Sequence, residues 1–188
     1  ALILSRLNVE DFGVAVWPLR ASAHRGVHSL TLGELVLGRL DAGGLGWALG
    51  AALGAKLGAP EKTVIATVGD GAYIFGAPTA AHLAAQVHKL PFLTVIFNNA
   101  GWEAVERATR SVHPDGWAAT TATFPLTGLS SAASYEEIVR SFGGHGERVE
   151  DPADLPGALR RALRVVREEG RQAALNVICQ RQPGSPKG

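Results

Sequence analysis

An acid and an amide stand at positions from which they could bind a common ligand. Gly69-Asp70-Gly71 directly follows the apolar, β-branched run of residues 64–68, and Asn98-Asn99 directly follows a second apolar run, residues 92–97. Such runs are typical of buried parallel strands. Between the triplet and the pair lie 26 residues, with apolar side chains at helical spacing (Ala80, Leu83, Ala84 and Val87). The stretch predicts a strand, helix, strand unit.

The predicted unit would bring Asp70 and Asn99 to one crevice, because parallel strands joined by a right-handed crossover end at the same edge of a sheet. A carboxylate and a neutral amide oxygen suit a hard cation such as Mg²⁺, which completes its octahedron from phosphate and water. Gly71 and Ala72 lead into the helix and could present backbone N–H groups to an anion. We interpret the unit as a clamp for magnesium and a diphosphate.

These residues resemble a known family. The pattern Gly-Asp-Gly, about 26 residues, Asn-Asn is similar to the cofactor motif of thiamine-diphosphate enzymes, and its surroundings resemble acetolactate synthase and benzoylformate decarboxylase. A second block, residues 43–55, resembles the segment that these enzymes place before the metal motif. The resemblance covers residues 42 to the C-terminus, about the last third of a full-length member, and residues 1–41 match least.

The resemblance implies roles for individual residues. Asp70, the Asn99 side chain and the Gly101 carbonyl would be the magnesium ligands, and Gly71 and Ala72 would meet the diphosphate. Family members often carry serine at the position of Ala72, so a hydroxyl contact is absent here.

The second block would bind the other end of the cofactor. Gly43-Gly44-Leu45-Gly46 would line it, with the Gly43 carbonyl on the pyrimidine amino group and Leu45 wedged beneath the bent cofactor. Asn98 would mainly position the turn. Trp102 would either flank the cofactor or substrate, or pack against the glycine-rich turn.

The implied function is that of the diphosphate-binding domain of a 2-oxo-acid decarboxylase or acetolactate synthase-like enzyme. In the family the cofactor lies between two domains, and the other domain supplies a glutamate that acts on the pyrimidine ring. No glutamate here sits in a matching motif, and we expect Glu103 and Glu106 to face solvent. The resemblance therefore implies a partner, a pyrimidine-binding domain or subunit, in a homo- or hetero-oligomer that acts on a small 2-oxo acid.

Two other functions remain open. The chain could be a degenerate module that keeps the magnesium and diphosphate contacts but has lost catalysis, since residues 1–41 match poorly. It could also be an unrelated nucleotide-binding α/β domain with a chance Gly-Asp-Gly. The chain could be a natural subunit or a fragment of a longer protein.

The alternation of strands and helices predicts an α/β fold: one domain, residues 1–188, with a doubly wound, mainly parallel sheet and helices on both faces. Beyond the central unit we expect a strand at 14–17, a helix at 46–57 and a helix at 134–143 whose Ser134 and Glu137 form a capping box. A strand at 146–149, a helix opened by Asp151-Pro152, a strand at 173–179 and a flexible tail at 180–188 follow.

Composition argues against several partners. The formal net charge is +1, which gives no electrostatic reason to bind nucleic acid, and no apolar run is long enough to span a membrane. The one cysteine, Cys179, favours a reducing compartment, so we expect a cytoplasmic protein. His24, His28 and Glu34 lack metal-site spacing and are interpreted as surface residues.

Overall fold

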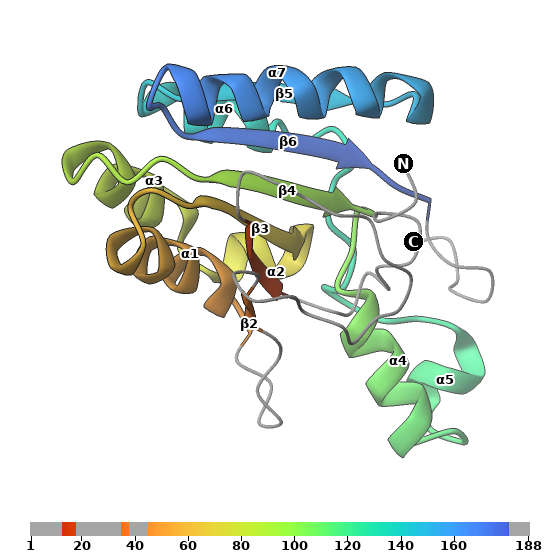
Figure 1. Cartoon of the computed structure of the whole chain (residues 1–188). Helices are drawn as coiled ribbons and strands as arrows, with labels where there is room; N and C mark the ends of the chain where they lie inside the picture. Colours follow the sequence, from red (N-terminus) through yellow and green to blue (C-terminus); the bar gives the residue numbers. More distant parts are fainter. Residues whose placement is uncertain (1–12, 18–34, 38–44, 181–188) are drawn as a thin grey trace.

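The protein is represented by a computed structural model that describes residues 13–17, 35–37 and 45–180. These residues form a six-stranded sheet in the order β2-β1-β3-β4-β6-β5 (Figure 1). Its strands are β1 (Gly13–Trp17), β2 (Leu35–Leu37), β3 (Thr63–Gly69), β4 (Leu93–Asn98), β5 (His145–Val149) and β6 (Ala173–Ile178).

Four of the strands run parallel. β3 pairs with β4, β4 with β6 and β6 with β5 in parallel, whereas β1 lies antiparallel to both β2 and β3. The mainly parallel α/β sheet predicted from the sequence is therefore confirmed, and the strand expected at 14–17 exists. Residues 1–12, 18–34, 38–44 and 181–188 lie outside the described residues, and so do the expectations for His24, His28 and most of the tail.

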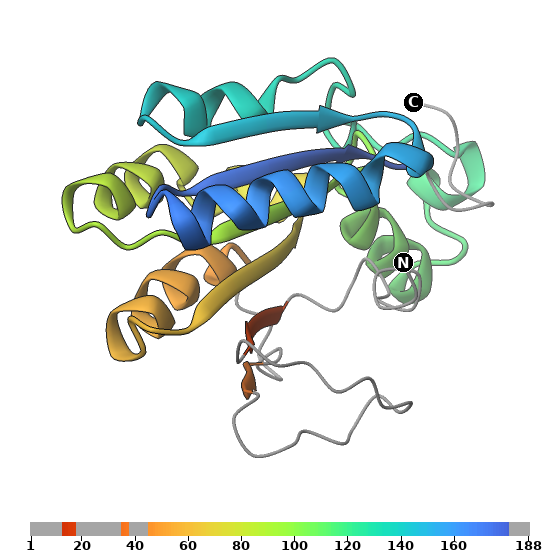
Figure 2. The same ribbon diagram turned by 45° about the horizontal axis from the view of Figure 1, so that its top comes forward.

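Helices cover both faces of the sheet. The helices α1 (Trp47–Gly58), α2 (Asp70–Phe75), α3 (Pro78–Val87) and α6 (Tyr135–Ser141) pack on one face. The 3₁₀ turn η2 (Pro152–Asp154) precedes α7 (Leu155–Glu168), which packs on the other face and runs along β6 (Figure 2). The two helices α4 (Glu103–Val112) and α5 (Trp117–Thr121) lie beyond the carboxyl end of β4 (Figure 1).

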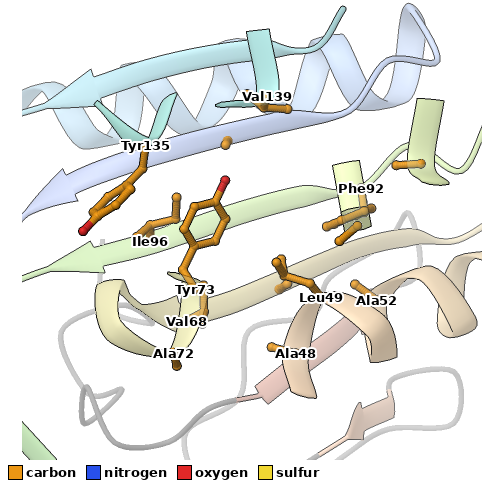
Figure 3. Packing of buried hydrophobic residues seen from close by; sticks show 14 of the residues in the cluster. Ala48, Leu49, Ala52, Val68, Ala72, Tyr73, Phe92, Ile96, Tyr135 and Val139 are labelled. Carbon is orange, nitrogen blue, oxygen red and sulfur yellow. The ribbon is translucent and has the colours of Figure 1, made fainter. Parts of the chain in front are cut away.

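The strict alternation of side chains divides the core into two layers. Along β3, Val64, Ala66 and Val68 face the layer of α1 and α3, and along β6, Leu175 and Val177 face α7. Figure 3 shows the first layer, in which Tyr73 and the residues around it fill the space between helices and sheet. Each fully buried large apolar side chain contributes roughly 1.5–3 kcal/mol, so these layers fix the positions of the strand ends.

The apolar residues from which helix α3 was predicted do not form the face that packs on the core. Leu83 and Val87 are 47% and 64% exposed, whereas Ala81, His82 and Ala85 are buried. The helix is confirmed, but its apolar stripe points outward. A polar residue takes the central core position because His82 is hydrogen-bonded there on both ring nitrogens.

The structure confirms the helix predicted at 46–57 as α1. A close approach to another backbone segment explains only some of its glycines. Gly46 has a φ of +80°, and a Cβ added to it would lie 2.7 Å from the Cα of Gly76. At Gly50 and Gly54, in contrast, an added Cβ would meet no described atom within 4 Å. The tight contact is thus between the start of α1 and the end of α2.

One of the two predicted helix caps forms. Asp151 accepts a hydrogen bond from the Ala153 N–H at 2.8 Å, as expected of an N-cap. Ser134 is also an N-cap residue, but its side chain makes no cap hydrogen bond within the described part of the chain. The predicted capping box was wrong, because the carboxylate of Glu137 instead pairs with Arg140 one turn further along α6.

Candidate functional site at the carboxyl edge of the sheet

Asp70 lies at the carboxyl end of β3 as the first residue of α2, and it is 2% exposed. Its Oδ1 accepts the Gly71 N–H at 3.0 Å, and its Oδ2 accepts the Gly101 N–H at 3.1 Å. Burial raises the pKa of this carboxyl group above its ordinary value, although the backbone donors act in the opposite direction. Asp70 is therefore a buried acid held in a fixed orientation by two segments of the chain.

The strand register explains why the two motifs meet. β3 and β4 are paired in parallel with Gly69 opposite Phe97, so Asp70 and Asn98 come next at the same level of the sheet. The hydrogen bond from Gly101 to Asp70 then joins the turn after β4 directly to the start of α2. The sequence prediction that the two strand ends meet at one edge is confirmed.

The turn after β4 is built by Asn98, which is fully buried. Its Oδ1 accepts the Ala100 N–H at 3.1 Å, the pattern of an Asx turn. Ala100 has a φ of +60°, a left-handed conformation that costs a non-glycine residue roughly 1–2 kcal/mol. Backbone strain of this kind is found at functional sites, where the surrounding structure enforces it.

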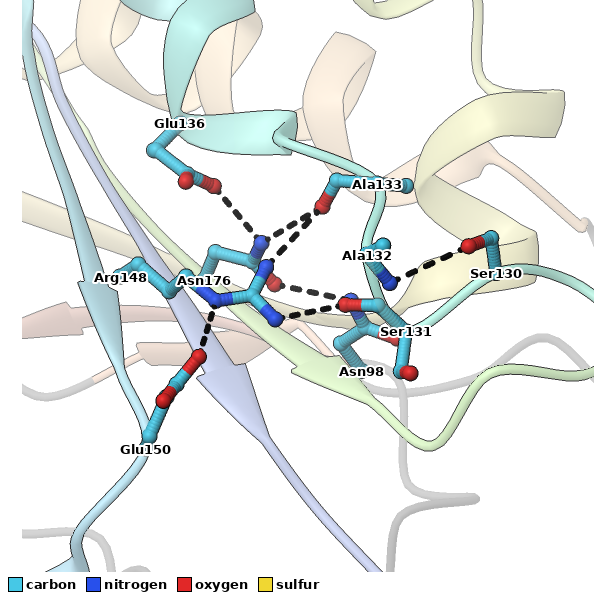
Figure 4. Close-up of polar contacts among 9 residues, drawn as sticks. All are labelled: Asn98, Ser130, Ser131, Ala132, Ala133, Glu136, Arg148, Glu150 and Asn176. Atoms are coloured by element: carbon cyan, nitrogen blue, oxygen red, sulfur yellow. Dashed lines mark hydrogen bonds and ion pairs between the residues drawn. The ribbon is translucent and has the colours of Figure 1, made fainter.

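A buried polar network of residues from β6, α6 and the loop before α6 holds the side chain of Asn98 in place (Figure 4). Asn98 Nδ2 donates to Asn176 Oδ1 at 3.2 Å, and Asn176 Nδ2 donates to Glu136 Oε2 at 2.7 Å and to the Ala133 carbonyl at 3.0 Å. Arg148 donates to the Ala133 and Ser131 carbonyls of the same loop. The network ties the turn to β6 and α6.

Sequence reasoning missed this network. Its one visible signal is Asn176, a polar residue inside the otherwise apolar strand β6. Glu136, in the first turn of α6, is 5% exposed, a burial that its sequence position does not indicate.

Asn99, the expected second magnesium ligand, is buried beside this turn and is oriented by a neighbouring acid. Its Nδ2 donates to Glu103 Oε2 at 2.6 Å. The prediction that Glu103 and Glu106 face solvent was wrong: Glu103 is half-buried, and Glu106 is 4% exposed and accepts a hydrogen bond from Thr127 Oγ1 at 2.6 Å. Both acids lie on α4, whose first turn is packed against the loop that contains Thr127.

Gly101 is buried in a short antiparallel bridge with Gly128. The bridge uses the Trp102 N–H, which donates to the Thr127 carbonyl, and the Ala100 carbonyl, which accepts from Leu129. Its two hydrogen bonds therefore do not involve the carbonyl of Gly101, the atom that the family resemblance assigns to magnesium.

The donor set fits a hard cation. Within the residues that the structure describes, no three His, Cys, Asp or Glu side chains cluster as metal ligands. The oxygens of the expected ligands Asp70, Asn99 and Gly101 are of another kind: one carboxylate, one side-chain amide and one peptide carbonyl. These are the donors that Mg²⁺ takes in proteins when phosphate and water complete its shell.

Trp102 packs on the Gly-Asp-Gly turn. A Cβ added at Gly71 would lie 2.8 Å from Cε3 of the indole, so the ring occupies the space that any larger residue there would need. The indole also meets Phe75 edge to face, with ring centroids 6.4 Å apart. Of the two roles that the sequence left open for Trp102, packing is the one seen here.

The structure describes only some of the remaining predicted site residues. Gly43 and Gly44 lie outside the described residues, Leu45 is 40% exposed, and Gly46 packs on Gly76. The Gly71 N–H, expected to meet a diphosphate, donates to Asp70 instead. Ala72 is buried within the first turn of α2.

Cys179 lies at the same edge. Its N–H donates to the Asn98 carbonyl at 2.7 Å, just beyond the end of β6. Burial and the nearby charge of Asp70 raise the pKa of its thiol. This protonated, half-buried thiol acts as a small packing side chain.

Comparison with known proteins identifies the family. The family described as thiamine pyrophosphate enzyme, C-terminal TPP binding domain, matches residues 23–177. Sulfoacetaldehyde acetyltransferase from Alcaligenes xylosoxydans xylosoxydans is 28% identical over 144 residues, 77% of this chain and 22% of the relative. The acetolactate synthase large subunit of Mycobacterium tuberculosis is 33% identical over 128 residues, 68% of this chain and 21% of the relative.

A solved structure has the same fold. The thiamine diphosphate-dependent 4-hydroxybenzoylformate decarboxylase of Rhodococcus jostii superposes with a TM-score of 0.62 at 24% identity, over 75% of this chain and 24% of that one. The chain thus spans only about a quarter of the length of these proteins. No helix in the described residues is long and apolar enough to cross a bilayer. The chain belongs to the thiamine pyrophosphate enzyme family, as its C-terminal TPP-binding domain.

Proposed function

We propose that this chain binds thiamine diphosphate through Mg²⁺ as the diphosphate-binding domain of a 2-oxo-acid decarboxylase or acetolactate synthase-like enzyme. The observation that supports the proposal most directly is the 3.1 Å hydrogen bond from the Gly101 N–H to Asp70 Oδ2. It joins the two halves of the motif, which lie 31 residues apart in the chain, at one buried edge of the sheet.

The residues have distinct roles in this proposal. Asp70, Asn99 and the Gly101 carbonyl hold Mg²⁺, and the buried carboxylate supplies the negative charge that the ion neutralises. Gly71 and Ala72 approach the diphosphate, and the Trp102 indole closes the side of the turn. Gly43-Gly44-Leu45-Gly46 contact the rest of the cofactor. Bound thiamine diphosphate supplies a carbon nucleophile for 2-oxo acids, and the chain's own residues bind and orient it.

Catalysis in this proposal requires a second, pyrimidine-binding domain or subunit. The chain covers 21–24% of the length of the proteins compared above, which are named as an acetyltransferase, an acetolactate synthase and a decarboxylase. The chain with its partner would form a cytoplasmic oligomer, in keeping with a single cysteine that forms no internal disulfide. The isolated chain should bind the cofactor weakly and turn over little.

Calorimetric titration tests the binding function. Thiamine diphosphate should bind only when Mg²⁺ is present, and Asp70→Ala should abolish this binding. Binding that is indifferent to Asp70→Ala, or preferential binding of ADP, would contradict the proposed magnesium clamp for thiamine diphosphate. Decarboxylation of pyruvate or benzoylformate, measured with and without a candidate partner, separates an active enzyme from a module that only binds.

A further inference from the structure

Glu103 differs from Asp70, the acid expected to bind magnesium, because the Glu103 carboxylate contacts another expected ligand, the side chain of Asn99. Its Oε2 accepts a 2.6 Å hydrogen bond from Asn99 Nδ2. A carboxylate can only accept, so the nitrogen of the Asn99 amide must face Glu103 and the oxygen must face the other way. The contact therefore decides which atom of the amide is presented at the edge.

The orientation matters because the two ends of an amide have opposite chemistry. The oxygen is a metal ligand, whereas the NH₂ group is a donor that a cation repels. Asn99 is 7% exposed, so solvent does little to fix its orientation. Glu103 is the first residue of α4, and Trp102 before it is held by a backbone hydrogen bond to Thr127.

We propose that Glu103 is a positioning residue for the metal site: its carboxylate holds the Asn99 amide with its oxygen toward Mg²⁺. This inference rests on the proposed function. Residues that hydrogen-bond to a metal ligand and so orient it typically lower metal affinity by about 10–100-fold when they are mutated. The same group would also favour Mg²⁺, which demands near-ideal octahedral geometry, over the more tolerant Ca²⁺.

A simpler role for Glu103 is to stabilise α4, because an acid in the first turn of a helix interacts favourably with the helix dipole. The two roles make different demands on the side chain. A glutamine at this position keeps an oxygen that can accept from Asn99 but loses the charge, whereas alanine loses both. Glu137 offers a matched control, since it is also an acid in a first helical turn, on α6, and pairs with Arg140 on the surface.

The test is titration calorimetry of the whole chain with Mg²⁺ and with Ca²⁺ in the presence of thiamine diphosphate. Glu103→Ala should weaken Mg²⁺ binding by about tenfold or more and Ca²⁺ binding by less than about threefold. Glu103→Gln and Glu137→Ala should both stay within about threefold of the wild type for Mg²⁺. Circular dichroism verifies folding, and Glu103→Met, which keeps chain length but accepts no comparable hydrogen bond, replaces the alanine variant if that fails to fold.

Four results would overturn the inference. Equal losses in Glu103→Ala and Glu103→Gln would show that charge, not orientation, is what the site needs. Equal losses for Mg²⁺ and Ca²⁺ would show a general loosening of the turn. Wild-type affinity in Glu103→Ala would remove the role outright while leaving the proposed function intact, whereas a wild-type chain that binds neither Mg²⁺ nor cofactor would overturn both.

Discussion

Helix α2 carries two buried polar side chains three positions apart, and they belong to networks of opposite character. Tyr73 lies in a closed chain: its hydroxyl donates to His82 Nε2 at 3.0 Å, and His82 Nδ1 donates to Gln172 Oε1 at 2.7 Å. Gln172 Nε2 in turn donates to the His82 carbonyl at 2.9 Å, which fixes the orientation of its amide and hence the tautomer of the histidine. Each of these donors meets an acceptor within the protein.

Asp70, by contrast, is a buried acid in the first turn of the same helix. Its carboxylate accepts the backbone N–H groups of Gly71 and Gly101, and the Asn99 amide nitrogen of the same edge donates to Glu103. Burial raises the pKa of Asp70 and lowers that of His82, in both cases because burial disfavours the charged form. The neutral network of Tyr73, His82 and Gln172 serves the fold, whereas the buried acid is the residue to which the proposed function assigns a cation.

The largest effect should come from Asp70→Asn. Magnesium affinity should fall by about a hundredfold or more, equivalent to about 2.7 kcal/mol, because the charged ligand is lost. Stability should change by less than about 2 kcal/mol, since the amide leaves one backbone N–H unpaired but removes a desolvated charge. Calorimetry and urea unfolding measure the two quantities, and a variant that binds magnesium like the wild type would contradict the contrast between the networks.

Tyr73→Phe should show the opposite pattern. Loss of the hydroxyl leaves His82 Nε2 as a buried acceptor without its donor, which should lower the free energy of unfolding by about 1–3 kcal/mol. Magnesium affinity should not change. Tyr135→Phe is the control, because its ring packs edge to face on Tyr73 at 5.6 Å but lies outside this hydrogen-bonded chain. Figure 3 shows the two rings together. A Tyr73→Phe variant that unfolds like Tyr135→Phe would contradict the structural role.

The pH dependence of the free energy of unfolding should reflect the titration of His82. Its pKa is lowered in the folded protein, so the unfolded chain binds more protons below its ordinary pKa of about 6.5. The contribution of His82 is therefore fully present above about pH 6.5 and decreases as the pH falls below it. At pH 5.5 the loss should be about 1 kcal/mol relative to pH 7.5.

His82→Gln provides the comparison for this pH effect. Urea unfolding of the wild type and of this variant at both pH values isolates the histidine, because Asp70 and the surface groups contribute to both proteins. Equal pH dependence in the two proteins would show that His82 is not held neutral by the fold.

Much of the architecture follows from the sequence because its signals are local. The apolar runs before Asp70 and Asn99 end in glycine and in amides, which specifies two buried strands and the edge at which they finish. Asp151 forms the predicted cap, although on the 3₁₀ turn η2 that precedes α7, because that contact spans only two residues. Local signals of this kind do not depend on which distant segments pack against them.

What the sequence did not predict depends on contacts between distant segments. Asn98 meets Asn176 across 78 residues and His82 meets Gln172 across 90. The apolar stripe of α3 was a poor guide because a buried histidine with two hydrogen bonds took the core position instead. Glu106 was assigned to solvent because its partner Thr127 lies 21 residues further along the chain. Glu103 was assigned to solvent although its partner Asn99 is only four residues away, because the sequence does not show that the turn after β4 brings the two side chains together.

The smallest effect distinguishes a glycine required by the site from one that is not. Gly71→Ala should weaken magnesium binding about threefold to tenfold, about 0.7–1.4 kcal/mol, because the added methyl group must displace the Trp102 indole that lies 2.8 Å from its position. Gly50→Ala should leave binding unchanged and raise stability by roughly 0.5–1 kcal/mol, since an added Cβ meets no described atom within 4 Å and alanine is the better helix former. Tryptophan fluorescence and calorimetry measure both. If Gly71→Ala behaves like Gly50→Ala, the indole does not brace the Gly-Asp-Gly turn, and the carboxylate of Asp70 is held by its two backbone donors alone.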